Sequence, residues 1–139
     1  MAAFVADKKV MESLTFNPML GHITTFGGNP VSCAAACGVM DVFEKENLLD
    51  KVEEKGMLFY QLLQHPKIKE IRRIGLMLAV ELASHEEVKK VVDYCLQQGV
   101  ILFWFLSTNN SFRIAPPLTI HENEIREGCG IIRDALDTL

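Results

Sequence analysis

Apolar residues recur along the chain with two kinds of spacing, one typical of strands and one typical of helices, and together they predict a mixed order of strands and helices. An apolar run at residues 2–6 is typical of a buried strand, and residues 8–14 have room for one or two helical turns. Later apolar positions at helical spacing mark four helices, within residues 31–43, 48–63, 88–96 and 125–136. Three further apolar runs predict strands at residues 76–82, 100–106 and 112–115.

Capping residues set the ends of several of these helices. Asn29 is a good N-cap, and Pro30 suits a first helical position, where no backbone N–H is needed. Ser84 and Glu87 have the spacing of a capping box, and Gly99 ends the helix that follows them. Residues 15–30 show no period and contain several glycines and prolines, so they predict a long loop.

This order of elements predicts an α/β protein in which residues 31–139 form a two-layer domain of sheet and helices. The strand at residues 2–6 fits less well, because it is followed by a long loop and not by a partner strand. We therefore expect it to belong to a sheet whose other strands are absent from this chain.

Composition and charge exclude several classes of protein. The 139 residues are 49% hydrophobic, which is too apolar for a disordered tail. The net charge of −4 argues against a nucleic-acid partner, which would require a basic face. The longest apolar run, residues 100–106, is too short to cross a membrane, and the N-terminus lacks the order of a signal peptide. We expect a cytoplasmic protein.

The cysteines and histidines predict no metal site. The four cysteines form no CxxC pair, and no histidine is placed to complete a site with Cys33 and Cys37. All four cysteines are expected to be small buried residues in a reducing compartment.

The first candidate for a binding site is the segment of residues 22–30, HITTFGGNP. Two hydroxyls, Thr24 and Thr25, precede two glycines and a capped helix, a combination that could hold a phosphate through hydroxyls and backbone N–H groups. The segment matches neither the P-loop nor GxGxxG. An ordinary helix entry with a flexible lead-in explains the same residues, so both interpretations stay open.

Arg113 is the second candidate for a site residue. In the run FRIAPP it points opposite to Phe112 and Ile114, because side chains alternate along a strand. It either faces water or reaches into a site, where its planar fork would suit a carboxylate. The strand pattern alone favours the surface position.

Three motifs give the chain a resemblance to the class III aminotransferases, the pyridoxal-phosphate-dependent group that acts on ornithine, acetylornithine and 4-aminobutyrate. Residues 22–36 resemble the family's HG(S/T)TFGGNP…CAAA signature, residues 72–77 its RGxGLM strand entry, and residues 112–120 its LRxxPPLxI motif. They occur in family order, and the resemblance covers essentially the whole chain. Ile23 and Arg73 stand where the family usually has glycine.

The resemblance implies a fold and site residues. Residues 31–139 would be the C-terminal small domain of a fold-type-I transferase, an antiparallel or mixed sheet covered by helices, and residues 1–30 the last strand and dimer-interface loop of the large domain. Thr25, helped by Thr24, would bind the phosphate of pyridoxal 5'-phosphate in the partner subunit of a homodimer. Arg113 would bind the α-carboxylate of the amino-acid substrate.

The resemblance also implies that catalytic parts lie elsewhere. The family's Schiff-base lysine would lie upstream of Met1, so this chain is expected to contain no catalytic residue and to be an inactive fragment. The complete enzyme would move an amino group from an ω-amino donor such as ornithine or acetylornithine to a 2-oxo acid such as 2-oxoglutarate. A stand-alone, non-catalytic binding or regulatory module derived from the same domain is the alternative.

Overall fold

The computed structural model describes residues 2–16, 19, 21, 23–105 and 107–139. His22, in the first motif, and Leu106, at the end of a predicted strand, lie outside the described residues. The chain divides into two compact units, Met1–Glu46 and Asn47–Leu139.

The first unit contains two helices, α1 (Lys8–Phe16) and α2 (Pro30–Glu46), neither of which has a buried residue. The Asp7 carboxylate accepts a hydrogen bond of 2.9 Å from the Lys9 N–H, which caps the start of α1. The predicted helical turns at residues 8–14 and the predicted helix after Asn29 are confirmed, and both helices extend further than the apolar spacing indicates.

The predicted strand at residues 2–6 is wrong for this chain. These residues have no regular secondary structure, and the side chain of Phe4 is 74% exposed. A strand is held by hydrogen bonds to a neighbouring strand, and the described part of the first unit contains no such neighbour. The apolar run is present, but the pairing that would make it a strand is not.

The second unit is built on a four-stranded antiparallel sheet. Its strands are β1 (Glu70–Ile74), β2 (Met77–Glu81), β3 (Phe103–Trp104) and β4 (Ser111–Ile114), in the spatial order β1-β2-β4-β3. The register places Arg72, Ala79, Arg113 and Phe103 in one row across the sheet. This sheet and its helices confirm the predicted α/β class.

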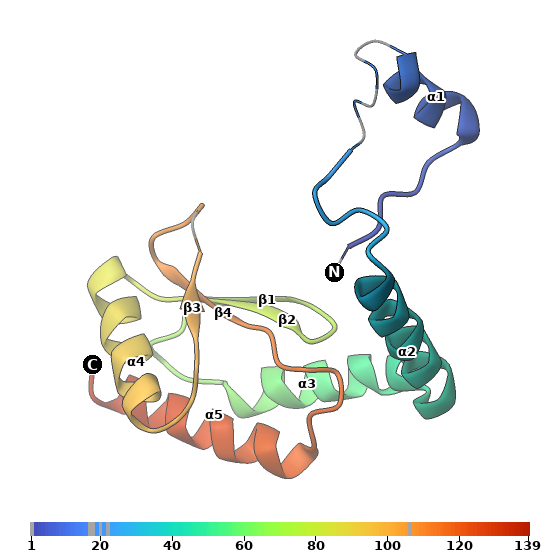
Figure 1. Ribbon diagram of the computed structural model, residues 1–139. Helices are drawn as coiled ribbons and strands as arrows, with labels where there is room; N and C mark the ends of the chain where they lie inside the picture. Colours follow the sequence, from blue (N-terminus) through green and yellow to red (C-terminus); the bar gives the residue numbers. More distant parts are fainter. Residues whose placement is uncertain (1, 17–18, 20, 22, 106) are drawn as a thin grey trace. The chain divides into compact units, whose positions relative to one another are not determined.

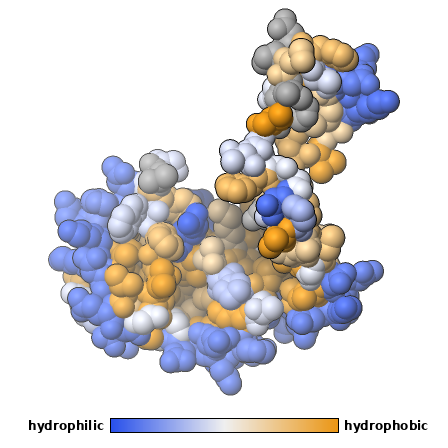
Figure 2. All heavy atoms as spheres, viewed as in Figure 1, coloured by the Kyte–Doolittle hydropathy of each residue, from blue (hydrophilic) through white to orange (hydrophobic). Residues whose placement is uncertain are grey.

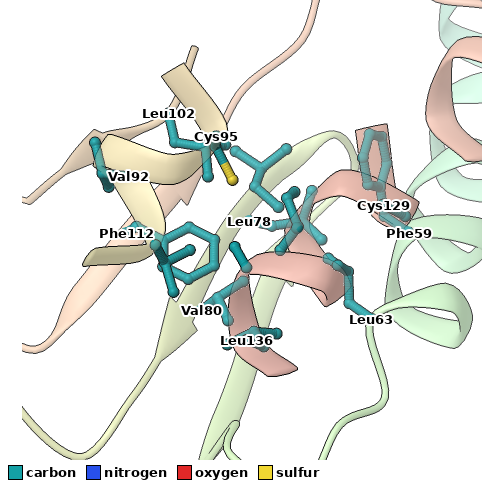
Figure 3. Close-up of a cluster of buried hydrophobic side chains, with 14 of the residues drawn as sticks. Phe59, Leu63, Leu78, Val80, Val92, Cys95, Leu102, Phe112, Cys129 and Leu136 are labelled. Carbon is teal, nitrogen blue, oxygen red and sulfur yellow. The ribbon is translucent and has the colours of Figure 1, made fainter. Parts of the chain in front are cut away.

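Three helices cover one face of the sheet: α3 (Val52–Leu62), α4 (His85–Gln97) and α5 (Glu122–Asp137) (Figure 1). A short 3₁₀ helix, η1 (Leu48–Lys51), precedes α3. The predicted cap of α4 is confirmed, since Ser84 Oγ accepts a hydrogen bond of 3.3 Å from the Glu87 N–H. The helices, β2 and β4 enclose one hydrophobic core, shown in Figure 3, which includes Phe59, Leu78, Val80, Cys95, Phe112, Cys129, Ile132 and Leu136.

The second unit differs from the predicted elements in three places. The helix expected within residues 48–63 is divided at Lys51 and Val52 into η1 and α3. Of the described residues 100–105 of the strand expected at residues 100–106, Phe103–Trp104 form β3. The strand β1 is not among the predicted strands, because its charged side chains hide the alternation that usually reveals a strand. Among the described residues, no helix has both the length and the apolar character that a membrane span requires.

Candidate functional site

The loop that carries Thr24 and Thr25 is a tight turn fastened to the start of α2. The Gly27 N–H donates to the Thr24 carbonyl at 3.1 Å, and the Asn29 N–H donates to the Phe26 carbonyl at 3.1 Å. The Asn29 side chain then accepts hydrogen bonds from the first N–H groups of α2, including that of Val31 at 3.1 Å. The predicted N-cap is therefore confirmed.

The two glycines fit this turn for different reasons. A Cβ atom on Gly27 would lie 2.7 Å from the Thr24 hydroxyl oxygen, which is too close for a side chain to be added without a shift. Gly28 has a φ of 73°, in the left-handed region that favours glycine. The absence of a side chain on Gly27 thus leaves room for the Thr24 hydroxyl.

Thr24 and Thr25 are both exposed, and within the described part of the chain neither hydroxyl has a hydrogen-bond partner. Two free hydroxyls beside a glycine turn and a helix N-terminus are groups that can donate to a phosphate. The residues present therefore fit the phosphate group of pyridoxal phosphate.

Arg113 lies on β4, on the face of the sheet opposite the core. Its neighbours Phe112 and Ile114 are buried under the helices, so alternation turns Arg113 to the open face. Its Cα partners are Ala79 on β2 and Phe103 on β3. The side chain is half-buried, and its Nε is fully buried without a hydrogen-bond partner among the described residues.

The other two arginines of the sheet are neutralised. Arg72 is hydrogen-bonded to Glu70 and, at 2.8 Å, to Glu81; these bonds raise the pKa of Arg72 and lower that of Glu81. Arg73 donates to Glu53 at 2.6 Å, which raises the pKa of Arg73, and its side chain is only 15% exposed. Arg73 is therefore mostly withdrawn from water.

Arg113 differs from them because no carboxylate of the described residues pairs with it. A guanidinium that is partly withdrawn from water and lacks an anion offers a binding group for a carboxylate, which its fork can hold through two parallel hydrogen bonds. The surface interpretation that the strand pattern favoured is therefore weakened.

A shallow apolar groove of about 250 Å³ lies on the same open face. Ala79, the partner of Arg113, lines it, together with Arg72, Arg73, Ile74, Met77, Leu78 and Phe105. Figure 2 shows hydrophobic side chains gathered around β3, where Phe103 is 55% exposed. Sequence reasoning did not single out Phe103, whose ring centroid lies 5.8 Å from Cζ of Arg113.

The predicted site residues fall in different units: Thr24 and Thr25 in the first, Arg113 in the second. The described residues contain no group of three or more histidine, cysteine, aspartate or glutamate side chains arranged to hold a metal ion. Cys95 and Cys129 are buried as expected, whereas Cys33 and Cys37 on α2 are exposed, so the expectation that all four are buried is wrong for that pair.

Comparison with known proteins gives one consistent result. The sequence model of the family described as aminotransferase class-III matches residues 1–136. The chain is 37% identical to the acetylornithine aminotransferase of Haemophilus ducreyi over 140 residues, covering 100% of this chain and 34% of that protein. It is 36% identical to the 4-aminobutyrate aminotransferase of Escherichia coli, covering 99% of this chain and 34% of that protein.

Solved structures agree. A crystal structure of a Bacillus anthracis aminotransferase superposes with a TM-score of 0.81 and 29% identity, over 95% of this chain and 34% of that one. An omega transaminase from Pseudomonas jessenii, in complex with PMP, gives a TM-score of 0.79 and 26% identity, over 93% of this chain and 31% of that one. The chain thus spans about a third of the length of the relatives it matches.

Proposed function

The chain belongs to the class III aminotransferases, and from this premise we propose that it is the C-terminal part of a pyridoxal-phosphate-dependent transaminase. The complete enzyme would transfer an amino group from an amino acid, such as ornithine, acetylornithine or a similar ω-amino donor, to a 2-oxo acid such as 2-oxoglutarate. The family match over residues 1–136, which includes both the threonine loop and Arg113, carries this proposal.

In this proposal Arg113 binds the α-carboxylate of the substrate. Its half-buried side chain, its unpartnered Nε and the pairing of Arg72 and Arg73 with glutamates support the role. A charge-assisted pair between guanidinium and carboxylate also orients the substrate, because two parallel hydrogen bonds fix its plane.

Thr25, with Thr24, would bind the cofactor phosphate of the partner subunit in a homodimer. The exposed hydroxyls and the glycine turn beside the α2 N-terminus support this role. When bound, pyridoxal phosphate supplies the electron sink for transamination, and these residues would hold and orient it. Residues 1–30 would then belong to the large domain, and residues 31–139 would be the small domain.

A chimera tests the proposal in a complete active site. Residues 1–139 replace the matching C-terminal third of the Haemophilus ducreyi acetylornithine aminotransferase. We expect turnover of acetylornithine with 2-oxoglutarate by the chimera and none by the isolated 139-residue chain. Ornithine and 4-aminobutyrate as alternative donors measure the preference that this segment brings.

Two variants of the chimera test the assigned residues. Arg113→Gln removes a charged hydrogen-bond donor and should raise the KM for the amino-acid substrate about 10- to 150-fold, the equivalent of roughly 1.5–3 kcal/mol. Thr25→Val should weaken cofactor binding about tenfold, since one hydrogen bond to a phosphate is lost. Arg133→Gln is the matched control, because Arg133 is an exposed arginine of α5 outside the site.

The outcomes separate the two functions considered for the chain. Turnover by the isolated chain would contradict the proposal that it is one part of a larger active site. A folded chimera without turnover, or one in which Arg113→Gln behaves like Arg133→Gln, would contradict the transaminase role and favour the stand-alone binding module.

A further inference from the structure

The aromatic ring of Phe103 lies against the guanidinium group of Arg113, and this contact suggests a role for a residue outside the family motifs. The distance from Arg113 Cζ to the ring centroid is 5.8 Å, within the range of a cation–π interaction. Phe103 and Arg113 are Cα partners on the antiparallel strands β3 and β4, so the backbone register brings their side chains to the same face.

Packing of the core does not explain why a phenylalanine stands at this position. Phe103 is 55% exposed and does not belong to the buried cluster of the second unit. The next residue of β3, Trp104, is opposite the buried Phe112 and lines a cavity with residues of α4, including Val88 and Lys89, so it lies on the helix side. Phe103 is therefore the residue of β3 that faces Arg113.

Few contacts fix the orientation of the Arg113 guanidinium. No carboxylate of the described residues pairs with the guanidinium, and Nε is buried without a partner. Arg72 and Arg73, by comparison, are fixed by hydrogen bonds to glutamates. Guanidinium planes stack on aromatic faces, and an aromatic contact orients the fork without using its hydrogen-bond donors.

We propose that Phe103 is a positioning residue that orients the Arg113 guanidinium and leaves its donors available for a substrate carboxylate. The inference rests on the proposed role of Arg113 and adds the group that positions it. A carboxylate in the same place would fix the guanidinium more firmly, but it would occupy the donors that the substrate needs. An aromatic ring avoids that competition.

The first test is spectroscopic and uses the 139-residue chain. The sequence contains five arginines, and their Nε–Hε signals can be resolved by ¹⁵N-labelled NMR and assigned with Arg113→Lys. Phe103→Leu should shift the Arg113 signal, because the ring current is lost, and Phe103→Tyr should restore it. Trp104→Leu is the matched control on the same strand, with a side chain that is 52% exposed, and should leave the signal in place.

The second test is kinetic and uses the chimera described above. Phe103→Leu should raise the KM for 2-oxoglutarate about two- to fivefold with kcat unchanged, the range that an exposed cation–π contact provides. Phe103→Tyr should return the KM to the parent value, and Trp104→Leu should not change it. This separation of KM from kcat is what a group that positions a binding residue predicts.

Two results would overturn the inference: an unchanged Arg113 signal and KM in Phe103→Leu, or equal effects of Phe103→Leu and Trp104→Leu, which would indicate general loosening of β3. Failure of the proposed function is a different result. In that case Arg113→Gln leaves the KM unchanged, while the NMR shift still shows whether Phe103 orients the guanidinium.

Discussion

Helix α3 and the turn between β1 and β2 approach so closely at Gly56 that any side chain there should destabilise the second unit. A Cβ on Gly56 would lie 2.2 Å from the carbonyl oxygen of Gly75 and 2.8 Å from its carbonyl carbon. Ordinary contacts begin near 3.4 Å, so Gly56→Ala requires the helix and the turn to separate by about 1.2 Å. The atoms that collide belong to backbone and cannot move aside as a flexible side chain can.

The turn itself has little freedom to move. Gly75 has a φ of 54°, and a Cβ on Gly75 would lie 2.5 Å from a methyl group of Val52 on α3. The hydrogen bond of 2.6 Å between Arg73 and Glu53 joins the same two elements. Overpacking of this kind costs roughly 1–3 kcal/mol, and the better helix propensity of alanine returns up to about 1 kcal/mol. We expect a net loss of about 1–2 kcal/mol.

Thermal unfolding followed by circular dichroism at 222 nm measures this loss. At roughly 4–8 °C for each kcal/mol in a domain of this size, Gly56→Ala should lower the Tm by about 4–16 °C. Gly130→Ala on α5 is the control, because a Cβ there meets nothing within 4 Å, and it should stabilise by about 0.5–1 kcal/mol. A Gly56→Ala chain as stable as the parent, with Gly130→Ala stabilising as expected, would refute the reasoning.

Three further predictions concern charge, thiol chemistry and the core. The hydrogen bond from Arg72 holds the pKa of Glu81 below its ordinary value of 4.5, so its stabilisation is present above that value and is lost as the pH falls through the lowered pKa. In urea titrations, Glu81→Gln should be less stable than the parent at pH 7, and a difference that persists in strong acid would contradict this. Burial raises the pKa of Cys95 to about 11 and that of Cys129 to about 12, so Ellman's reagent at pH 8 should modify only the two exposed cysteines of α2 until denaturant is added. Phe112→Ala should cost roughly 3–5 kcal/mol by the urea midpoint, because this fully buried ring lies in the core; a loss below 1 kcal/mol would show that the core closes over the gap.

The features of the fold that depend only on residues close in sequence were the easiest to predict. The caps at Asn29 and Ser84 were predictable because each depends only on a side chain and the two or three N–H groups that follow it. The buried stripe of α5, including Ile125, Cys129 and Ile132, followed from helical spacing for the same reason. These features need no knowledge of distant parts of the chain.

Features that depend on pairing were harder to predict. The apolar run at residues 2–6 is typical of a strand, yet apolar character alone cannot supply the neighbour that a strand requires. The strand β1 is hard to predict for the opposite reason, because it carries the charged residues Glu70, Arg72 and Arg73. Arg72 pairs with Glu70 and with Glu81 of β2, and Arg73 pairs with Glu53 of α3. Strand formation here depends on partners that the local sequence does not reveal.

The register of the β3–β4 hairpin shows how far the sequence could have led toward the site. The turn residues Thr108 to Asn110 predict a hairpin. If the two strands paired symmetrically about Asn109, Phe105 would lie opposite Arg113. The observed pairing is symmetric about Thr108 and places Phe103 opposite Arg113. Both registers put an aromatic ring beside the arginine. An aromatic neighbour was therefore predictable from the spacing, although its identity was not.

Whether the Arg113 guanidinium is free to bind a carboxylate depends on the whole sheet and not on the motif that contains Arg113. The alternation rule decides only that Arg113 points away from Phe112. Three arginines lie on the sheet, and each could take up a nearby carboxylate; the register gives Glu81 to Arg72, and the packing of α3 gives Glu53 to Arg73. Within the described part of the chain, Arg113 is left with an aromatic neighbour and no paired carboxylate. Arg72 is the other sheet arginine of this face, and it is already paired with Glu81. Among the described residues of this face of the sheet, an incoming carboxylate therefore meets Arg113 as the unpaired guanidinium, and that selectivity follows from the pairing of its neighbour.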